Sequence, residues 1–132
     1  MRGSTILVVD DDVDASDVVR RLLKSLGARV VVAENGREGL SRLANTPSHA
    51  VLCDLEMPIM DGLEFARRVR RDPRYRQVLL FALTGWQAEA DFRRTWEAGF
   101  DAHLVKPVTM EMLYSLARRL SDRAVRTEQP GA

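Results

Sequence analysis

The sequence predicts an α/β domain in which a doubly wound, five-stranded parallel sheet carries helices on both faces. Five short apolar runs rich in Val and Leu have the character of strands buried on both faces. They alternate with segments whose apolar residues recur at helical spacing. Because crossovers between parallel strands are strongly biased to the right hand, this order places helices on both faces. The apolar runs cover residues 6–9, 29–33, 50–53, 78–83 and 102–105.

A helix is expected after each strand. The first has apolar residues at helical spacing as far as Leu26, and Gly27 then supplies a helix stop. The second begins at Asn35, a candidate N-cap with Glu38 at the capping-box spacing. The third ends near Pro73, because the residue before a proline disfavours helical backbone.

The fourth predicted helix ends at Gly99, and Thr109 is a candidate N-cap for the fifth. Apolar residues at helical spacing mark the five helices, and of these Leu40 and Leu43 are expected to face inward. They are Val18, Val19, Leu22, Leu23 and Leu26, then Leu40 and Leu43, then Leu63, Ala66 and Val69, then Phe92, Trp96 and Ala98, and finally Leu113, Leu116, Ala117 and Leu120. We expect one domain over residues 1–123 and a flexible polar tail over residues 124–132.

Composition excludes several classes of protein. The 132 residues are 45% hydrophobic and 30% charged with a net charge of +1, which argues against disorder and against a globally basic nucleic-acid binder. No apolar stretch approaches the roughly 20 residues of a membrane span, and residues 1–4 lack a signal-peptide layout, so we expect a cytoplasmic protein. Cys53 is the only cysteine, which excludes an intramolecular disulfide and favours a buried, inert thiol.

Charged residues follow three of the apolar runs at the point where each run ends. Asp10 and Asp11 follow residues 6–9, Asp54 follows residues 51–53, and Lys106 follows residues 104–105. In an open parallel sheet the carboxyl ends of the strands form the crevice that binds ligands, so these side chains are expected to converge. Clustered carboxylates repel one another, and a divalent cation would relieve that repulsion.

The residue types indicate the chemistry of such a site. A carboxylate at Asp54 could attack a phosphorus atom and form a mixed anhydride, provided that the charge of the two groups is neutralised. Mg²⁺ suits this role because it prefers six oxygen ligands and retains waters, whereas the lack of a His/Cys cluster argues against zinc.

At these residues the sequence resembles the receiver domain of two-component response regulators, the CheY-like family, from Thr5 to about Leu120. The resemblance rests on the acidic doublet Asp10–Asp11, on Asp54 with Met57-Pro58 and Asp61-Gly62 behind it, on Thr84 at the end of the fourth strand, and on Lys106-Pro107 after the fifth. Each element alone is weak, but together, in order and at strand ends, they are specific. The resemblance implies a flavodoxin-like strand order of 2-1-3-4-5.

The resemblance also implies a role for each site residue. Asp54 would be the phosphoacceptor, the Lys106 ammonium would pair with a phosphoryl oxygen, and the Thr84 hydroxyl would hydrogen-bond another and act as the switch. The bond between Lys106 and Pro107 is expected to be cis. Mg²⁺, for which Mn²⁺ could substitute, would be ligated by Asp11, by Asp54, by the backbone carbonyl of Glu56 and, through water, by Asp10.

Three residues depart from the commonest receiver pattern. His103 stands where many members have Tyr or Phe that rotates inward; because a protonated imidazole has less affinity for an apolar site, we hypothesise that signalling weakens below neutral pH. Glu56 and Trp86 stand where the family's hydrolytic water passes, so we predict a long-lived phosphoryl group. A stacking role on the surface is an alternative for Trp86.

Other polar residues have structural interpretations. Asp12 and Asp14 are expected at a helix start, Asp61 in a turn beside Gly62, and His49 at a strand edge or cap rather than as a ligand. A basic run is interpreted as a solvated helix face rather than a nucleic-acid surface. It consists of Arg67, Arg68, Arg70, Arg71, Arg74 and Arg76.

The sequence therefore favours a stand-alone phosphoacceptor that takes a phosphoryl group from a histidine kinase or a histidine phosphotransfer protein. It would signal by a population shift that changes the face made by the fourth helix, fifth strand and fifth helix. We expect no nucleic-acid domain. We also expect no enzymatic activity beyond its own phosphorylation and dephosphorylation. One alternative is a receiver detached from a hybrid histidine kinase, favoured by residues 83–86 and 99–108. Others are an aspartyl-phosphate phosphatase using Glu56 and a phosphorylation-independent scaffold.

Overall fold

The computed structural model describes residues 1–85 and 92–128, with side chains described as far as Asp122. Strands and helices alternate along these ranges, as expected from the sequence. The elements are β1 (Thr5–Val9), α1 (Val13–Ser25), β2 (Arg29–Ala33), α2 (Gly36–Asn45), β3 (Ala50–Asp54), α3 (Gly62–Arg71), the short 3-10 helix η1 (Pro73–Tyr75), β4 (Leu79–Thr84), α4 (Phe92–Ala98), β5 (Ala102–Val105) and α5 (Met110–Glu128).

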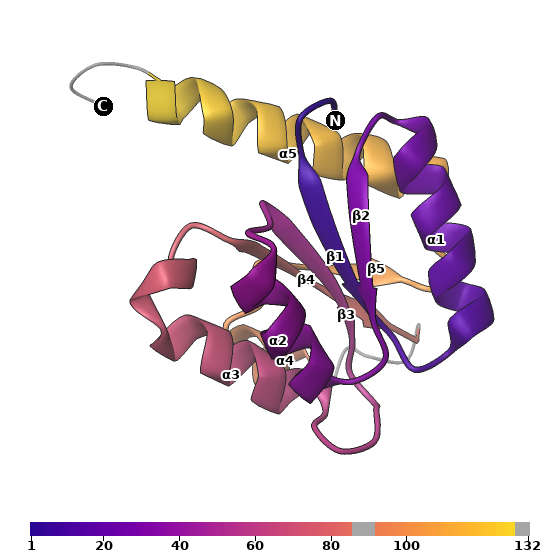
Figure 1. Ribbon diagram of the computed structural model, residues 1–132, viewed down its shortest axis with the longest axis vertical. Helices are drawn as coiled ribbons and strands as arrows, with labels where there is room; N and C mark the ends of the chain where they lie inside the picture. Colours follow the sequence, from indigo (N-terminus) through magenta and orange to yellow (C-terminus); the bar gives the residue numbers. More distant parts are fainter. Residues whose placement is uncertain (86–91, 129–132) are drawn as a thin grey trace.

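The strands form one parallel sheet in the order β2-β1-β3-β4-β5, which confirms the predicted fold class and strand order. Figure 1 shows α1 and α5 on one face of the sheet and α2, α3 and α4 on the other. The central strands end level with one another, because Val9 pairs with Cys53 and Asp54 pairs with Leu83. The residues that follow them therefore meet at one edge of the sheet.

Each face of the sheet has its own hydrophobic layer. Alternate side chains of a strand point to opposite faces, so Leu7 and Val51 pack with α2, α3 and α4, whereas Ile6 and Leu52 pack with α1 and α5. All four of these side chains are fully buried. This burial on both faces explains why the runs are continuously apolar rather than alternating.

The helix starts are capped largely as predicted. The side chain of Asp12 accepts a hydrogen bond from the Ala15 N–H at 3.1 Å, and that of Asn35 accepts one from the Glu38 N–H at 2.9 Å. Asp61 was predicted to lie in a turn, and this prediction was wrong. Its carboxylate accepts a hydrogen bond from the Glu64 N–H at 2.9 Å, so Asp61 is the N-cap of α3.

The C-terminal helix is longer than the sequence suggests. The backbone of α5 continues to Glu128, into the segment 124–132 that we expect to be a tail, and the flexibility of that segment stays a prediction. Across the described ranges, no helix has both the length and the apolar character needed to cross a membrane.

One arginine of the basic run is not solvated. Arg67 and Arg68 pair with Glu64 on the exposed face of α3, as expected. Arg70 instead reaches inward, where its guanidinium donates to the carbonyls of Gly99 and Val78, each at 2.8 Å, and pairs with Asp101 at 2.7 Å. The interpretation of Arg70 as part of a solvated face is therefore wrong, since its hydrogen bonds join α3 to the segments that flank β4 and β5.

Candidate functional site

The predicted charged residues do converge at the carboxyl edge of the sheet. Asp10 and Asp11 follow β1, Asp54 ends β3 and Lys106 follows β5. One carboxylate oxygen from each of Asp10, Asp11 and Asp54 lies within 4.8 Å of the others. Asp10 is almost completely buried and Asp11 is exposed, so the cluster leads from the core out to solvent.

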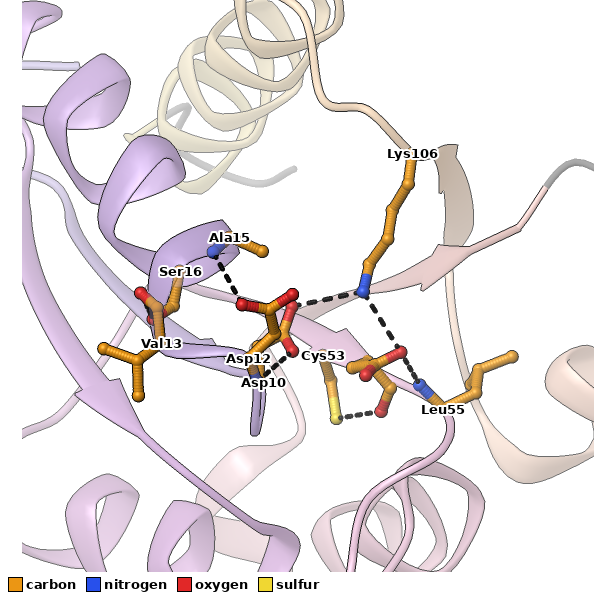
Figure 2. A network of polar contacts seen from close by, with 9 residues as sticks. Asp10, Asp12, Val13, Ala15, Ser16, Cys53, Leu55 and Lys106 are labelled. Carbon is orange, nitrogen blue, oxygen red and sulfur yellow. Dashed lines mark hydrogen bonds and ion pairs between the residues drawn. The ribbon is translucent and has the colours of Figure 1, made fainter.

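Lys106 bridges two of these carboxylates. Figure 2 shows its side chain reaching down to the acidic cluster, with Nζ 3.2 Å from Asp10 Oδ2 and 3.5 Å from Asp54 Oδ1. Asp54 Oδ1 also accepts the Leu55 N–H at 2.9 Å. Within the described residues Asp54 Oδ2 has no hydrogen-bond partner, so one oxygen of this carboxylate is held in place and the other is available for chemistry.

The electrostatics of the pair follow from burial and proximity. Burial raises the pKa of Asp54; the Lys106 ammonium lowers it and the Asp10 carboxylate raises it, with a net rise above the ordinary value. For Lys106, burial lowers the pKa, but the Asp54 and Asp10 carboxylates outweigh burial and raise it overall. Lys106 is therefore protonated at neutral pH. The ionised Asp54 carboxylate beside it is destabilised by burial and by Asp10.

Neutralising Asp54 should stabilise the metal-free fold. A carboxyl whose pKa is raised by folding gains stability as pH falls through that pKa, so its ionised form costs stability at neutral pH. We expect Asp54→Asn to raise the melting temperature by a few degrees at pH 7 in the presence of a chelator. Calorimetric scans at pH 7 check this, and a lower melting temperature for the variant would contradict it.

Thr84 contributes a buried hydroxyl with an unmet hydrogen bond. It ends β4 and is 4% exposed, and its Oγ1 has no hydrogen-bond partner among the described residues. Buried polar atoms in native proteins are nearly always paired, so this hydroxyl is available to a partner beyond the described residues. The strand pairing sets Thr84 one residue beyond the partner of Asp54, so both residues lie at the carboxyl ends of neighbouring strands.

The donor set suits a hard cation. Three carboxylates offer oxygen ligands, which Mg²⁺ prefers. The nearest soft ligand is turned away, because the Cys53 Sγ is buried and donates to the Asp54 carbonyl at 3.2 Å, and burial raises the pKa of its thiol far above the usual range. Glu56 lies in the loop after β3 with an exposed side chain, and its backbone carbonyl remains a predicted ligand.

His103 lies away from the carboxylates. On β5, its Nε2 is hydrogen-bonded to Thr95 Oγ1, and its ring packs 4.4 Å from the Phe92 ring and 5.9 Å from the Trp96 ring. Burial lowers its pKa below the ordinary value. His103 therefore joins β5 to α4. These two elements belong to the face that the sequence analysis predicts to change on phosphorylation.

This environment should make His103 lower the stability of the protein as the pH falls. A histidine whose pKa is lowered by folding contributes stability above its unfolded pKa of 6.5, and the contribution is lost as pH falls through the folded pKa. We expect the drop in melting temperature between pH 7 and pH 5 to be smaller in His103→Tyr than in the wild type. Equal drops in the two proteins, measured by thermal unfolding, would show that His103 does not carry the effect.

The remaining predicted residues are placed as follows. The Lys106–Pro107 peptide bond is cis, as the resemblance implies. His49 accepts the Thr5 N–H at 3.0 Å at the amino end of the sheet, far from the acidic cluster, which confirms its structural interpretation. Trp86 lies outside the described residues, and its effect on phosphoryl lifetime stays a prediction.

Sequence reasoning missed an apolar cavity beside the site. It has a volume of about 370 Å³ and lies between α1 and the segment after β5. Val18, Val19, Pro107 and Val108 line it, and Lys106 and Asp10 lie at its edge. The sequence shows Val18 among the apolar residues of the first helix, and its side chain is 55% exposed beside this cavity.

Known proteins resemble this chain over most of its length. Residues 6–118 match the family model described as the response regulator receiver domain. The chain is 42% identical over 103 residues to a 14.6 kDa protein of Leptolyngbya boryana encoded in the sodA1 3′ region, covering 78% of this chain and 79% of that one. It is 35% identical over 116 residues to the sensor histidine kinase CheAY of Helicobacter pylori, covering 86% of this chain but only 14% of that protein.

Solved structures agree with the sequence matches. The receiver domain of the sensor histidine kinase PA1611 from Pseudomonas aeruginosa superposes with a TM-score of 0.81 at 29% identity, covering 89% of this chain and 97% of that one. That structure is described with a magnesium ion coordinated in its active-site cleft.

Proposed function

Because the chain belongs to the response regulator receiver domain family of two-component signalling, we propose that it accepts a phosphoryl group from a phosphohistidine donor on Asp54. The observation that carries this proposal is the arrangement around Asp54. One oxygen is held by Leu55 and Lys106, the other has no partner within the described residues, and the unpaired Thr84 hydroxyl lies on the adjacent strand.

Mg²⁺ would be held beside this carboxylate. Asp11 and Asp54 would ligate it directly, with the Glu56 carbonyl, while the buried Asp10 would act through a water molecule. When bound, the ion neutralises charge that builds up on the transferring phosphoryl group. The magnesium-bearing cleft of the PA1611 receiver supports this assignment.

The chain's own residues would carry out the transfer by position and charge. Asp54 Oδ2 attacks phosphorus as the bond from phosphorus to the donor imidazole nitrogen breaks, and the electron pair of that bond stays on the imidazole. The product is a mixed anhydride. The Lys106 ammonium, already 3.5 Å from the carboxylate, pairs with a phosphoryl oxygen. The Thr84 hydroxyl donates to another.

These contacts would also drive signalling. A phosphoryl group draws Lys106 away from Asp10 and gives Thr84 the hydrogen bond it lacks, which favours one arrangement of the region between β4 and α4. The readout would be the face of α4, β5 and α5, where Trp96 is 57% and Tyr114 is 52% exposed. A downstream protein would bind there, and the donor would be a histidine kinase or a histidine phosphotransfer protein.

We expect one phosphoryl group per chain and no sustained turnover of small phosphoesters. A phosphatase needs a second acid–base carboxylate at the reacting oxygen. The Glu56 side chain is exposed, and no contact with a described residue holds it beside Asp54. The buried Asp10 is already committed to Lys106 and to the Asp12 N–H. Steady release of phosphate over many equivalents would instead favour the phosphatase alternative.

Metal dependence tests the proposal. With acetyl phosphate and Mg²⁺, intact-mass spectrometry should show one added phosphoryl group per chain, and a chelator should lower the rate of its appearance by at least about a hundredfold. Mg²⁺ restored in excess of the chelator is the control. An adduct that forms equally fast in the chelator would contradict the proposed role of the metal.

A further inference from the structure

The loop after β3 is held at two points. At its base, the Gly62 N–H donates to the Leu55 carbonyl at 3.0 Å, and Leu55 in turn donates its N–H to Asp54 Oδ1 at 2.9 Å. At its far end, the Met60 carbonyl accepts the N–H of Gly36, the first residue of α2, at 3.0 Å. The loop is thus tied both to the phosphoacceptor strand and to a helix outside the site.

The far end has an uncommon backbone conformation. Met60 N–H donates to the Pro58 carbonyl at 2.8 Å, which closes a three-residue turn around Ile59. Ile59 has a φ of 71°, a conformation that β-branched residues rarely adopt, and its side chain is 75% exposed. Because the Ile59 side chain is not packed, the turn depends on its neighbours to stay in place.

Gly36 supplies that support, and its lack of a side chain lets the loop approach closely. Its N–H is one of the helix-start donors that lack a partner inside the helix, and Met60 is the acceptor that satisfies it. A methyl group on the Gly36 Cα would lie 2.7 Å from the Met60 carbonyl oxygen and 2.8 Å from Met60 Cγ. A side chain at residue 36 therefore requires the loop or the start of α2 to shift.

The segment between the two ties holds the proposed metal ligand. Within the described part of the chain, no backbone hydrogen bond holds Glu56 or Met57 directly. The position of the Glu56 carbonyl therefore depends on Leu55 on one side and on the Met60 turn on the other. If the hydrogen bond between Met60 and Gly36 shifts, the Glu56 carbonyl is expected to move, whereas Asp54 and Lys106 keep their contacts with Leu55, with Asp10 and with each other.

We propose that Gly36 is a positioning residue for the metal site and that the first turn of α2 sets Mg²⁺ affinity through Met60. This inference rests on the proposed function, because it needs the Glu56 carbonyl as a ligand. Residues that orient metal ligands typically change affinity by about tenfold to a hundredfold when altered. The effect belongs to metal binding and not to the phosphoryl-transfer chemistry.

A matched pair of variants in the same helix tests it. Gly36→Ala pushes against the loop, whereas Gly39→Ala meets Phe65 Cε1 at 2.9 Å and Val9 Cγ2 at 3.1 Å, so the nearest atoms it meets lie in the core and not in the loop. By calorimetric titration with Mg²⁺, Gly36→Ala should bind about tenfold more weakly than the wild type, and Gly39→Ala should bind like the wild type. At saturating Mg²⁺, Gly36→Ala should regain the wild-type rate of phosphorylation by acetyl phosphate.

The outcomes separate the inference from the proposed function. If the wild type and Gly39→Ala bind Mg²⁺ and Gly36→Ala binds equally well, only the positioning role is overturned. If the wild type itself fails to bind Mg²⁺, the proposed metal site is overturned, and the positioning role with it.

If Gly36→Ala does not fold, a measurement on the wild type tests the positioning role of Gly36 instead. Coupling between two sites is reciprocal, so bound Mg²⁺ should tighten the tie between Met60 and Gly36. Amide hydrogen exchange should then slow at Gly36 as well as at residues 54–57. Slowing at residues 54–57 with unchanged exchange at Gly36 would overturn the inference.

Discussion

Replacing Asp54 by asparagine should lower phosphoryl uptake from acetyl phosphate by at least about a thousandfold, because the variant lacks the nucleophile. The amide keeps the size of the side chain and can still accept the Leu55 N–H, so the loss would reflect chemistry and not collapse of the site. The measurement is retention of label from a radiolabelled phosphodonor at saturating Mg²⁺.

The matched control for this variant is Asp12→Asn. Asp12 lies beside the cluster and caps α1, and asparagine is an equally good N-cap, so the control removes one nearby negative charge while the helix start is preserved. It should take up label at nearly the wild-type rate. Equal uptake by Asp54→Asn and the wild type would remove Asp54 from its proposed role.

The largest expected effect on stability is that of Arg70→Ala, with a loss of about 2–4 kcal/mol in the free energy of unfolding. The truncation leaves the Gly99 and Val78 carbonyls without this donor and Asp101 without its cation. Asp101 also accepts the Leu80 N–H at 2.8 Å, so its displacement would loosen the start of β4.

The neighbouring Arg71 provides the control for this loss. It ends α3, its side chain is exposed, and no ion pair joins it to another described residue, so Arg71→Ala should change stability by no more than about 0.5 kcal/mol. Urea denaturation of the two variants and the wild type makes the comparison. Similar losses in both variants would mean that the inward contacts of Arg70 contribute little.

The sheet and the cluster of charged residues could be predicted from the sequence because each rests on local patterns. A strand buried on both faces is a continuous apolar run, and the first charged residue after it marks the end of the strand. Once the strands are parallel, Asp10, Asp54 and Lys106 must share an edge. No side-chain contact had to be known for that conclusion.

The features that sequence reasoning missed depend on contacts between distant segments. Arg70 looks like its neighbours in the basic run, and only the fold brings the Val78 and Gly99 carbonyls to it. The bridge from Lys106 to both Asp10 and Asp54 likewise depends on side-chain reach. Asp61 was assigned to a turn because Asp-Gly pairs favour turns, but the helix begins at the very next residue.

Chemical trapping of the adduct tests the central claim most directly. After reaction with acetyl phosphate and Mg²⁺, borohydride reduces an aspartyl phosphate to homoserine, and peptide mass spectrometry locates the converted residue. The account predicts conversion at Asp54 alone. Conversion at Asp10, Asp11 or Asp12 instead, or a phosphoryl adduct that resists borohydride, would contradict it.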